Sequence, residues 1–217
     1  MVCMTGKEFM LAVLKAISQE IINHEEELNH LDNAIGDGDH GTNMARFSRI
    51  VLLDLPELAA EEDLGKILHR VGMRCITEIG GSAGPLFGKF YLQAGMTNMG
   101  NTYMEAANWV VSFEEGTMGV SQIGRSVEGE KTMLDALFPA DRAMQEALEE
   151  GRTFQEILLA GAEAAAKGVE YTKTIQASKG RAAYLGLRSV GHQDPGATTV
   201  MLMLQAMHKV AVEMQVE

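Results

Sequence analysis

Apolar side chains recur at intervals of three and four along most of this chain, and glycine-rich stretches interrupt the pattern. The first run consists of Phe9, Met10, Val13, Leu14, Ile17 and Ile21. This spacing is typical of an α-helix with one buried face, which we expect to continue to about Leu31. Similar runs follow at about 64–76, 86–96, 102–113, 140–150, 153–168 and 195–214. No segment alternates polar and apolar residues long enough to predict a strand. We therefore expect one all-α domain of about eight helices, closed around a shared core as a bundle or helical barrel.

Local capping signals predict several helix ends. Thr5 and Thr153 each stand three residues before a glutamate, which is the spacing of a capping box. Asp194 stands before a proline and predicts the N-terminus of the last helix, while Gly151 predicts a C-terminal stop. The glycines at 116, 119, 124 and 129 predict a loop that leads into a helix near 131. Only four prolines and 6% aromatic residues agree with a helix-rich fold, because strands favour aromatic and β-branched residues.

The charge of the chain excludes several classes of partner. There are 18 Lys and Arg against 30 Asp and Glu, which gives a net charge of −12. Such a surface repels phosphate backbones and anionic lipid, so we expect no nucleic acid and no membrane partner. No apolar stretch approaches the length of a membrane span, and no targeting segment stands out. Cys3 and Cys75 cannot form a disulfide framework, so the composition predicts a reduced, cytoplasmic setting.

A short acidic loop is the most informative motif. Gly36-Asp-Gly-Asp-His-Gly41 places two aspartates among glycines, which leave the backbone free to aim both carboxylates at one point, and Asp32 lies shortly before them. Converging carboxylates repel, and a hard divalent cation neutralises them. The alternative is a solvated acidic turn. An EF-hand is excluded because its twelfth position is Ser48, and the literal GxGxxG match is accidental because no strand precedes it.

Three further glycine-containing segments stand at expected helix starts. The segment 80–89 lacks the Ser or Thr that a P-loop requires after its lysine, since Phe90 stands there. Its free backbone N–H groups would suit an anion, although taken alone the small residues favour tight helix packing over an anion site. The segment 191–199 is a second helix N-terminus of this kind, and 129–135 is a weaker one. If these loops meet at one end of the bundle, the aspartates and helix N-termini would form a Mg-nucleotide site.

Four motifs, in order along the chain, carry a resemblance to a known family. They read LDNAIGDGDHGTNM at 31–44, GGSAGPLFG at 80–88, GEKTMLD at 129–135 and GHQDPGATT at 191–199. Together they resemble the nucleotide-binding L subunit of dihydroxyacetone kinase, over the whole of 1–217 as one L-type domain. The resemblance implies an antiparallel eight-helix barrel with a nucleotide site that caps one end. It also implies two Mg²⁺ ions that bridge the phosphates of ADP or ATP and are held by Asp32, Asp37 and Asp39.

The resemblance further implies nucleotide contacts and partners. The contacts would be His40, Gly41, Thr42, Asn43, Gly81, Ser82, Ala83, Gly124, Met133, Arg181, Asp194, Pro195 and Gly196. No catalytic residue beyond this site is implied, because the family holds dihydroxyacetone on a histidine of a separate K subunit. A phosphorylated M subunit of the phosphotransferase system would recharge bound ADP, a version that a stand-alone L chain favours over exchange with ATP. Two alternatives stay open: an ATP-dependent L-type subunit for another triose or tetrose, and a non-catalytic, nucleotide-bound partner of a transcription regulator.

Overall fold

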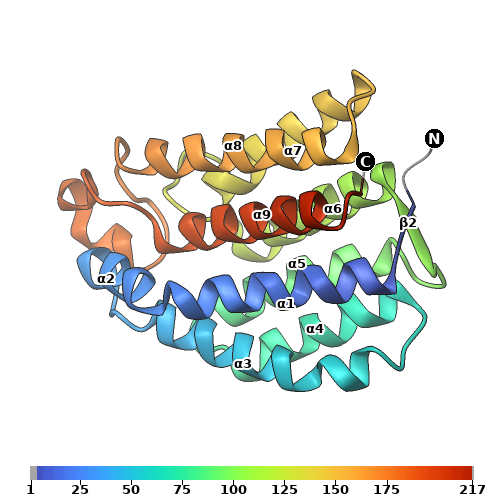
Figure 1. The fold of residues 1–217 in the computed structure, drawn as a ribbon. Helices are drawn as coiled ribbons and strands as arrows, with labels where there is room; N and C mark the ends of the chain where they lie inside the picture. Colours follow the sequence, from blue (N-terminus) through green and yellow to red (C-terminus); the bar gives the residue numbers. More distant parts are fainter. Residues whose placement is uncertain (1–3, 217) are drawn as a thin grey trace.

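The computed structural model describes residues 4–216, whose helices run alternately in opposite directions around one core (Figure 1). Within this range, eight helices form a closed ring in which each packs on the next and the last packs on the first. They are α1 (Lys7–Asn23), α3 (His40–Leu58), α4 (Leu64–Glu78), α5 (Ala83–Met96), α6 (Ala106–Gly124), α7 (Leu134–Glu149), α8 (Phe154–Thr172) and α9 (Pro195–Glu213). The predicted all-α antiparallel barrel is confirmed.

The remaining elements close the two ends of the ring. At one end lie α2 (Glu25–Ile35), which packs on α3 and α9, and the 3₁₀ helix η1 (Arg181–Ser189), which packs on α2. At the opposite end, β1 (Met4–Gly6) pairs antiparallel with β2 (Tyr103–Glu105). Figure 1 shows α2 beside the orange segment that leads into α9, away from both chain termini. The four glycine-containing motifs all reach the end that carries α2 and η1.

Three local predictions were wrong, and each has a physical reason. The first helix breaks at His24, whose Nδ1 lies 2.9 Å from the carbonyl oxygen of Glu20 and so engages the helix end. Thr5 does not cap a helix, because it lies in β1 and donates its hydroxyl to the Met104 carbonyl 3.0 Å away. Gly116 and Gly119 lie inside α6 rather than in a loop. The absence of a side chain at these two positions lets α6 pack closely on α5, because a β-carbon there would crowd side chains of α5. The capping box at Thr153 and the N-cap at Asp194 are confirmed.

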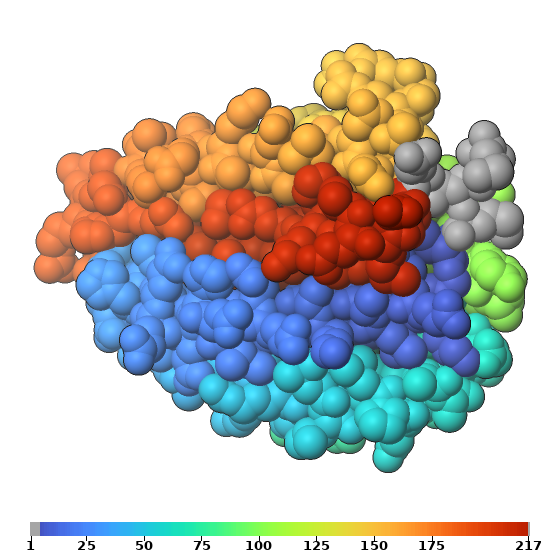
Figure 2. Space-filling view, viewed as in Figure 1, coloured from blue at the N-terminus to red at the C-terminus, as the bar shows by residue number. Residues whose placement is uncertain are grey.

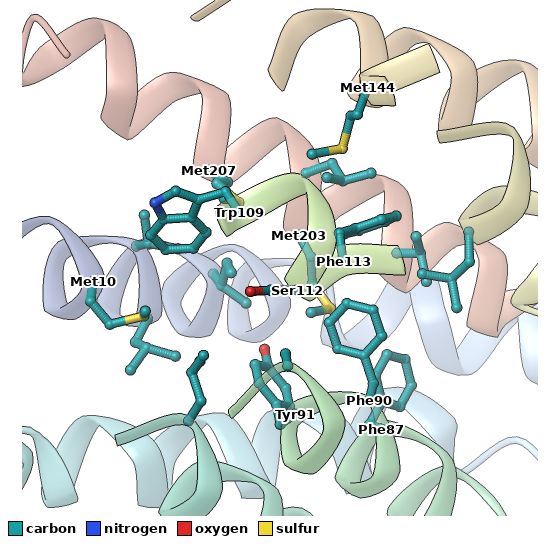
Figure 3. A pocket seen from close by; sticks show the side chains of 18 of the residues that line it. Met10, Phe87, Phe90, Tyr91, Trp109, Ser112, Phe113, Met144, Met203 and Met207 are labelled. Carbon is teal, nitrogen blue, oxygen red and sulfur yellow. The ribbon is translucent and has the colours of Figure 1, made fainter. Parts of the chain in front are cut away.

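Aromatic and methionine side chains fill the barrel. Trp109 lies edge-on to Phe9, with 5.6 Å between ring centroids, and donates its Nε1–H to Thr5 Oγ1 over 2.7 Å. A small cavity of about 70 Å³ remains among apolar side chains from several helices (Figure 3). Cys75 is buried in this core, whereas Cys3 lies outside the described residues. Along 4–216, no helix combines the length and apolar character needed to cross a bilayer.

Candidate functional site

A cleft of about 500 Å³ opens at the end of the barrel that carries α2 and η1. Its walls come from the end of α2, the starts of α3, α5 and α9, the end of α6, the loop before α7 and the start of η1. All the residues that the sequence singles out as metal or nucleotide contacts line this cleft, except Gly41 and Thr42. Residues as far apart in the chain as Asp32 and Gly196 thus meet at one surface, although which of these residues bind a ligand stays a prediction.

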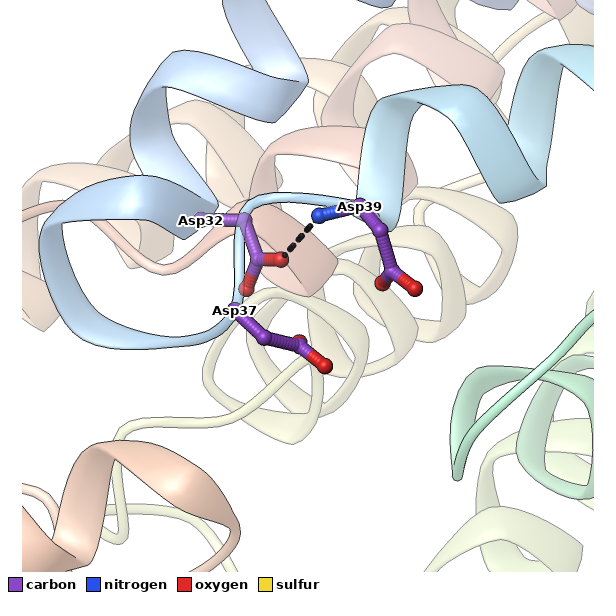
Figure 4. Close-up of side chains that lie close together, drawn as sticks. All are labelled: Asp32, Asp37 and Asp39. Atoms are coloured by element: carbon purple, nitrogen blue, oxygen red, sulfur yellow. Dashed lines mark hydrogen bonds between the residues drawn. The ribbon is translucent and has the colours of Figure 1, made fainter.

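The acidic loop brings its three carboxylates together. One oxygen from each of Asp32, Asp37 and Asp39 lies within 4.8 Å of the others (Figure 4). Asp32 also orders the loop, because its Oδ2 accepts the backbone N–H of Asp39 at 2.9 Å and that of His40 at 3.2 Å. Gly36 permits this arrangement, since a β-carbon there would overlap the Asp32 carboxylate. The loop therefore wraps around the carboxylate of Asp32, and Asp37 and Asp39 stay exposed.

These carboxylates fit a hard divalent cation. Two unit charges 4.8 Å apart repel by about 0.9 kcal/mol in bulk water and by about 3.5 kcal/mol at an effective dielectric of 20. The ion pair between Arg181 Nη2 and Asp37 Oδ2, 2.7 Å long, relieves only part of this repulsion. Oxygen ligands of this kind are the donors that Mg²⁺ prefers. Carboxylates that bind one ion together would be attracted to it, and this attraction would outweigh their mutual repulsion. Asp32, Asp37 and Asp39 are therefore the residues that could hold the metal.

His40 fixes the start of α3 against the start of α9. Its Nε2 lies 2.8 Å from Thr199 Oγ1, and the Thr199 hydroxyl donates to the Pro195 carbonyl over 3.0 Å. Because the hydroxyl proton is used there, the ring must donate its own Nε2–H. Burial lowers the pKa of His40, although the charges of Asp32 and Asp39 oppose this effect. A neutral ring thus joins two helix N-termini at the cleft.

Gly41 and Thr42 face α2 instead of the cleft. A β-carbon at Gly41 would overlap the carbonyl oxygen of Glu25. Thr42 exchanges two hydrogen bonds with Asn29, each 2.9 Å long, one through its backbone N–H and one through its hydroxyl. In this structure the two residues hold α2 on α3 and so support the acidic loop from behind.

The opposite wall of the cleft is a helix start built from small residues. Gly81, Ser82 and Ala83 form the turn that opens α5, with Gly81 at a φ of +66°. The side chain of Ser82 does not cap the helix, so the first backbone N–H groups of α5 stay open to an acceptor from solvent or from a ligand. Farther along this wall, Gly124 and Met133 line a more apolar part of the cleft, together with Leu86, Val120 and Ile123.

Lys131 is a cleft residue that the sequence reasoning missed. Its side chain is only 1% exposed, and its Nζ donates to the carbonyl oxygens of Thr172 and His192. Burial lowers the pKa of Lys131, whereas Asp194 and Asp135 act in the opposite direction. The ammonium therefore joins the end of α8 to the loop before α9. In the sequence, Lys131 directly follows Glu128-Gly-Glu130, and such a charged segment cannot be distinguished from an exposed turn without knowledge of those carbonyls.

Asp194 is the second buried charge at the cleft. Its Oδ2 accepts the N–H of Ala197 at 2.7 Å, and its own N–H donates to Thr172 Oγ1 at 3.0 Å. Burial raises the pKa of Asp194 to about 7, with a further contribution from Asp135, while Ala197 and Lys131 lower it. Asp194 thus anchors the start of α9 in the network that holds Lys131.

The comparisons with known proteins agree with this architecture. Residues 34–209 match the family model of the DAK2 domain. The chain is 39% identical over 195 residues to the ADP-binding subunit DhaL of the PEP-dependent dihydroxyacetone kinase of Escherichia coli, covering 89% of this chain and 92% of the relative. It is 30% identical over 201 residues to human triokinase/FMN cyclase, covering 93% of this chain but 35% of that longer protein.

Two solved structures share the fold. The dihydroxyacetone kinase of C. freundii in its native form superposes with a TM-score of 0.73, and its complex with AMP-PNP and Mg²⁺ with a TM-score of 0.70. Both are 24% identical to this chain and are matched over 94% of it, but the matched part is only about a third of each crystallised chain. This likeness concerns the fold of the barrel.

Proposed function

This chain belongs to the DAK2 domain family, and we propose that it is the nucleotide-binding subunit of a dihydroxyacetone kinase, with 1–217 as one L-type domain. The observation that carries the proposal is the convergence of three carboxylates at a cleft ringed by helix N-termini. Two Mg²⁺ ions held by Asp32, Asp37 and Asp39 would supply positive charge to the phosphates of ADP or ATP. Arg181 and the N-termini of α3, α5 and α9 would complete the phosphate site, and the cleft residues His40, Asn43, Gly124 and Met133 would contact the nucleotide.

In this proposal the chain performs one half of a phosphoryl transfer. Phosphoryl transfer depends on positioning and on neutralising charge on the phosphate oxygens, which is what a metal-nucleotide subunit supplies. The acceptor, dihydroxyacetone, would be held by a separate K subunit, and the phosphorylated M subunit would recharge the bound ADP. The similarity to ADP-binding subunits of PEP-dependent kinases, over nearly their full length in E. coli and Listeria innocua, supports this donor.

An ATP-dependent subunit is the second candidate. The chain is also similar to human triokinase/FMN cyclase and, at 33% identity, to a putative 3,4-dihydroxy-2-butanone kinase of tomato, and it spans about a third of each. In that case the nucleotide would exchange after each turnover, and the acceptor could be another triose or tetrose. The PEP-dependent and the ATP-dependent candidates thus differ in how tightly the cleft retains ADP.

Native mass spectrometry of the purified chain tests the proposal. A PEP-dependent subunit should retain one ADP and two Mg²⁺ ions through desalting, and it should transfer phosphate to a dihydroxyacetone-loaded K subunit once recharged. An ATP-dependent subunit should lose its nucleotide on desalting and regain it from added Mg-ATP. A folded chain that takes up neither Mg-ADP nor Mg-ATP would contradict both forms of the proposal.

A further inference from the structure

The 3₁₀ helix η1 borders the mouth of the cleft and is anchored on its inner side. Its first residues, Arg181 and Ala182, line the cleft. Ala182 and Leu185 pack with Ile35 of α2 and with Ala177, in a small apolar cluster separate from the barrel core. Figure 2 shows the orange-red chain of this region standing out beside the blue surface of α2, at the end of the molecule that holds the cleft. The position of η1 is therefore fixed relative to the acidic loop.

The solvent-exposed side of η1 carries the two most exposed large apolar side chains of residues 4–216. Tyr184 is 89% exposed and Leu187 is 78% exposed. Tyr184 lies one 3₁₀ turn after Arg181, and residues three apart in such a helix project from the same side. The backbone turns at Gly186, where φ is +56°, and then presents Leu187. Single exposed apolar residues are common on protein surfaces, but here two stand together on an anchored segment beside a ligand cleft.

One exposed cation, Arg188, adjoins Leu187, although the chain as a whole is acidic. Arg188 is exposed and, across residues 4–216, has no carboxylate within ion-pair distance. The other two cations of this segment are already paired, Lys179 with Glu130 at 3.9 Å and Arg181 with Asp37 at 2.7 Å. A tyrosine and a leucine beside a free guanidinium complement an apolar hollow that is edged by a carboxylate.

We propose that Tyr184 and Leu187 are the docking point for the chain that carries the phosphoryl acceptor. This inference rests on the proposed function, because the acceptor then has to come from outside. Reacting atoms must approach to about 3–3.5 Å for transfer, so the acceptor chain must cover the mouth of the cleft, and η1 forms one rim of that mouth. The occupant is thus a protein surface with an apolar hollow and a carboxylate at its edge. Arg181 would then contact the nucleotide, and Tyr184, on the same turn of η1, would contact the partner.

The double variant Tyr184→Ser, Leu187→Ser tests this proposal, with Leu53→Ser as the matched control. Leu53 is 77% exposed and lies on α3, outside the cleft lining. Phosphoryl transfer is measured against rising concentrations of the dihydroxyacetone-loaded K subunit from the organism that encodes this chain. We expect the KM for that subunit to rise about tenfold or more in the double variant, as for the loss of an interface hot spot. The kcat and the Kd for Mg-ADP should stay within about twofold, and the control should match the wild type.

Three outcomes would overturn the docking proposal alone. The KM for the K subunit could stay unchanged in the double variant. The effect could fall only on the KM for the phosphorylated M subunit, which would make the patch a donor contact. Light scattering could show a wild-type dimer that the double variant converts to monomer, which would make the patch a contact between copies of this chain. A wild-type chain that binds Mg-ADP but transfers nothing would instead refute the proposed function, and the docking proposal with it.

Discussion

Replacing Asp39 by Asn should stabilise the metal-free protein. The carboxylate oxygens of the acidic loop lie within 4.8 Å of one another, a distance at which two unit charges repel by about 0.9 kcal/mol in bulk water and about 3.5 kcal/mol at a dielectric of 20. Asp39 is exposed, so the lower value applies to each of its two pairs. Loss of a negative charge at the start of α3 offsets about 0.3–1 kcal/mol. The free energy of unfolding should therefore rise by about 1 kcal/mol.

The same substitution should have the opposite effect once Mg-ADP is added. A ligand present at 100 times its Kd stabilises the folded state by about 2.7 kcal/mol. If loss of one carboxylate weakens binding about a hundredfold, that stabilisation falls to about 0.4 kcal/mol. The variant should thus be more stable than the wild type in EDTA and less stable in Mg-ADP. Asp39 is preferable to Asp37 for this test, because Asp37 also pairs with Arg181 at 2.7 Å.

Urea denaturation with and without Mg-ADP measures both effects. Glu163→Gln is the control, since Glu163 is an exposed carboxylate on α8 that lies outside the cleft lining. It should leave the stabilisation by Mg-ADP unchanged. The reasoning fails if the Asp39→Asn chain keeps the wild-type stabilisation by Mg-ADP. It also fails if that chain is less stable than the wild type in EDTA, because the carboxylates would then not repel.

Two further substitutions test buried charges. Lys131→Met should lower the free energy of unfolding by about 3–5 kcal/mol in urea denaturation, because it leaves buried carbonyls and carboxylates without their cation. Lys15→Met, at an exposed lysine, should change the same free energy by less than about 0.5 kcal/mol. Equal effects of the two substitutions would contradict the role of Lys131. Burial, with Glu114 adding to it, raises the pKa of Asp141 to about 6, so the folded state loses stability as pH rises from about 4 through 6. Asp141→Asn should therefore stabilise the protein by about 1–3 kcal/mol at pH 8. The difference in the free energy of unfolding between variant and wild type should shrink toward pH 4. A constant difference across this range would contradict the raised pKa of Asp141.

The parts of the fold that could be predicted are those set by local sequence. Helical periodicity and the caps at Thr153 and Asp194 depend on residues a few positions apart, and they were predicted correctly. The wrong predictions depend on distant partners. In the sequence Thr5 looks like a helix cap, but its hydroxyl donates a hydrogen bond to the carbonyl oxygen of Met104, 99 positions away. Gly116 looks like a loop residue until α5 packs against it, with Phe90 in the space of its missing β-carbon.

The same distinction applies to the cleft. The acidic loop could be predicted because its glycines and aspartates are contiguous, and Asp32 orders that loop from only seven residues away. Lys131 could not be identified, because its partners are backbone carbonyls at Thr172 and His192, which every residue possesses. No side-chain pattern marks such a partner. A buried cation that is held by carbonyls is visible only when the tertiary structure is known.

The charges of the cleft explain how an acidic protein could hold a nucleotide. Four carboxylates line it, from Asp32, Asp37, Asp39 and Asp194, against the three cations of Lys131, Lys179 and Arg181. With all of them ionised, the cleft carries one net negative charge. The lysine charges are already engaged by carbonyl oxygens, and that of Arg181 by Asp37. The side chains alone therefore offer little free positive charge to a phosphate group. Two divalent ions would reverse the sign of the whole cleft, so metal and nucleotide should bind together, and chelation of the metal should release both.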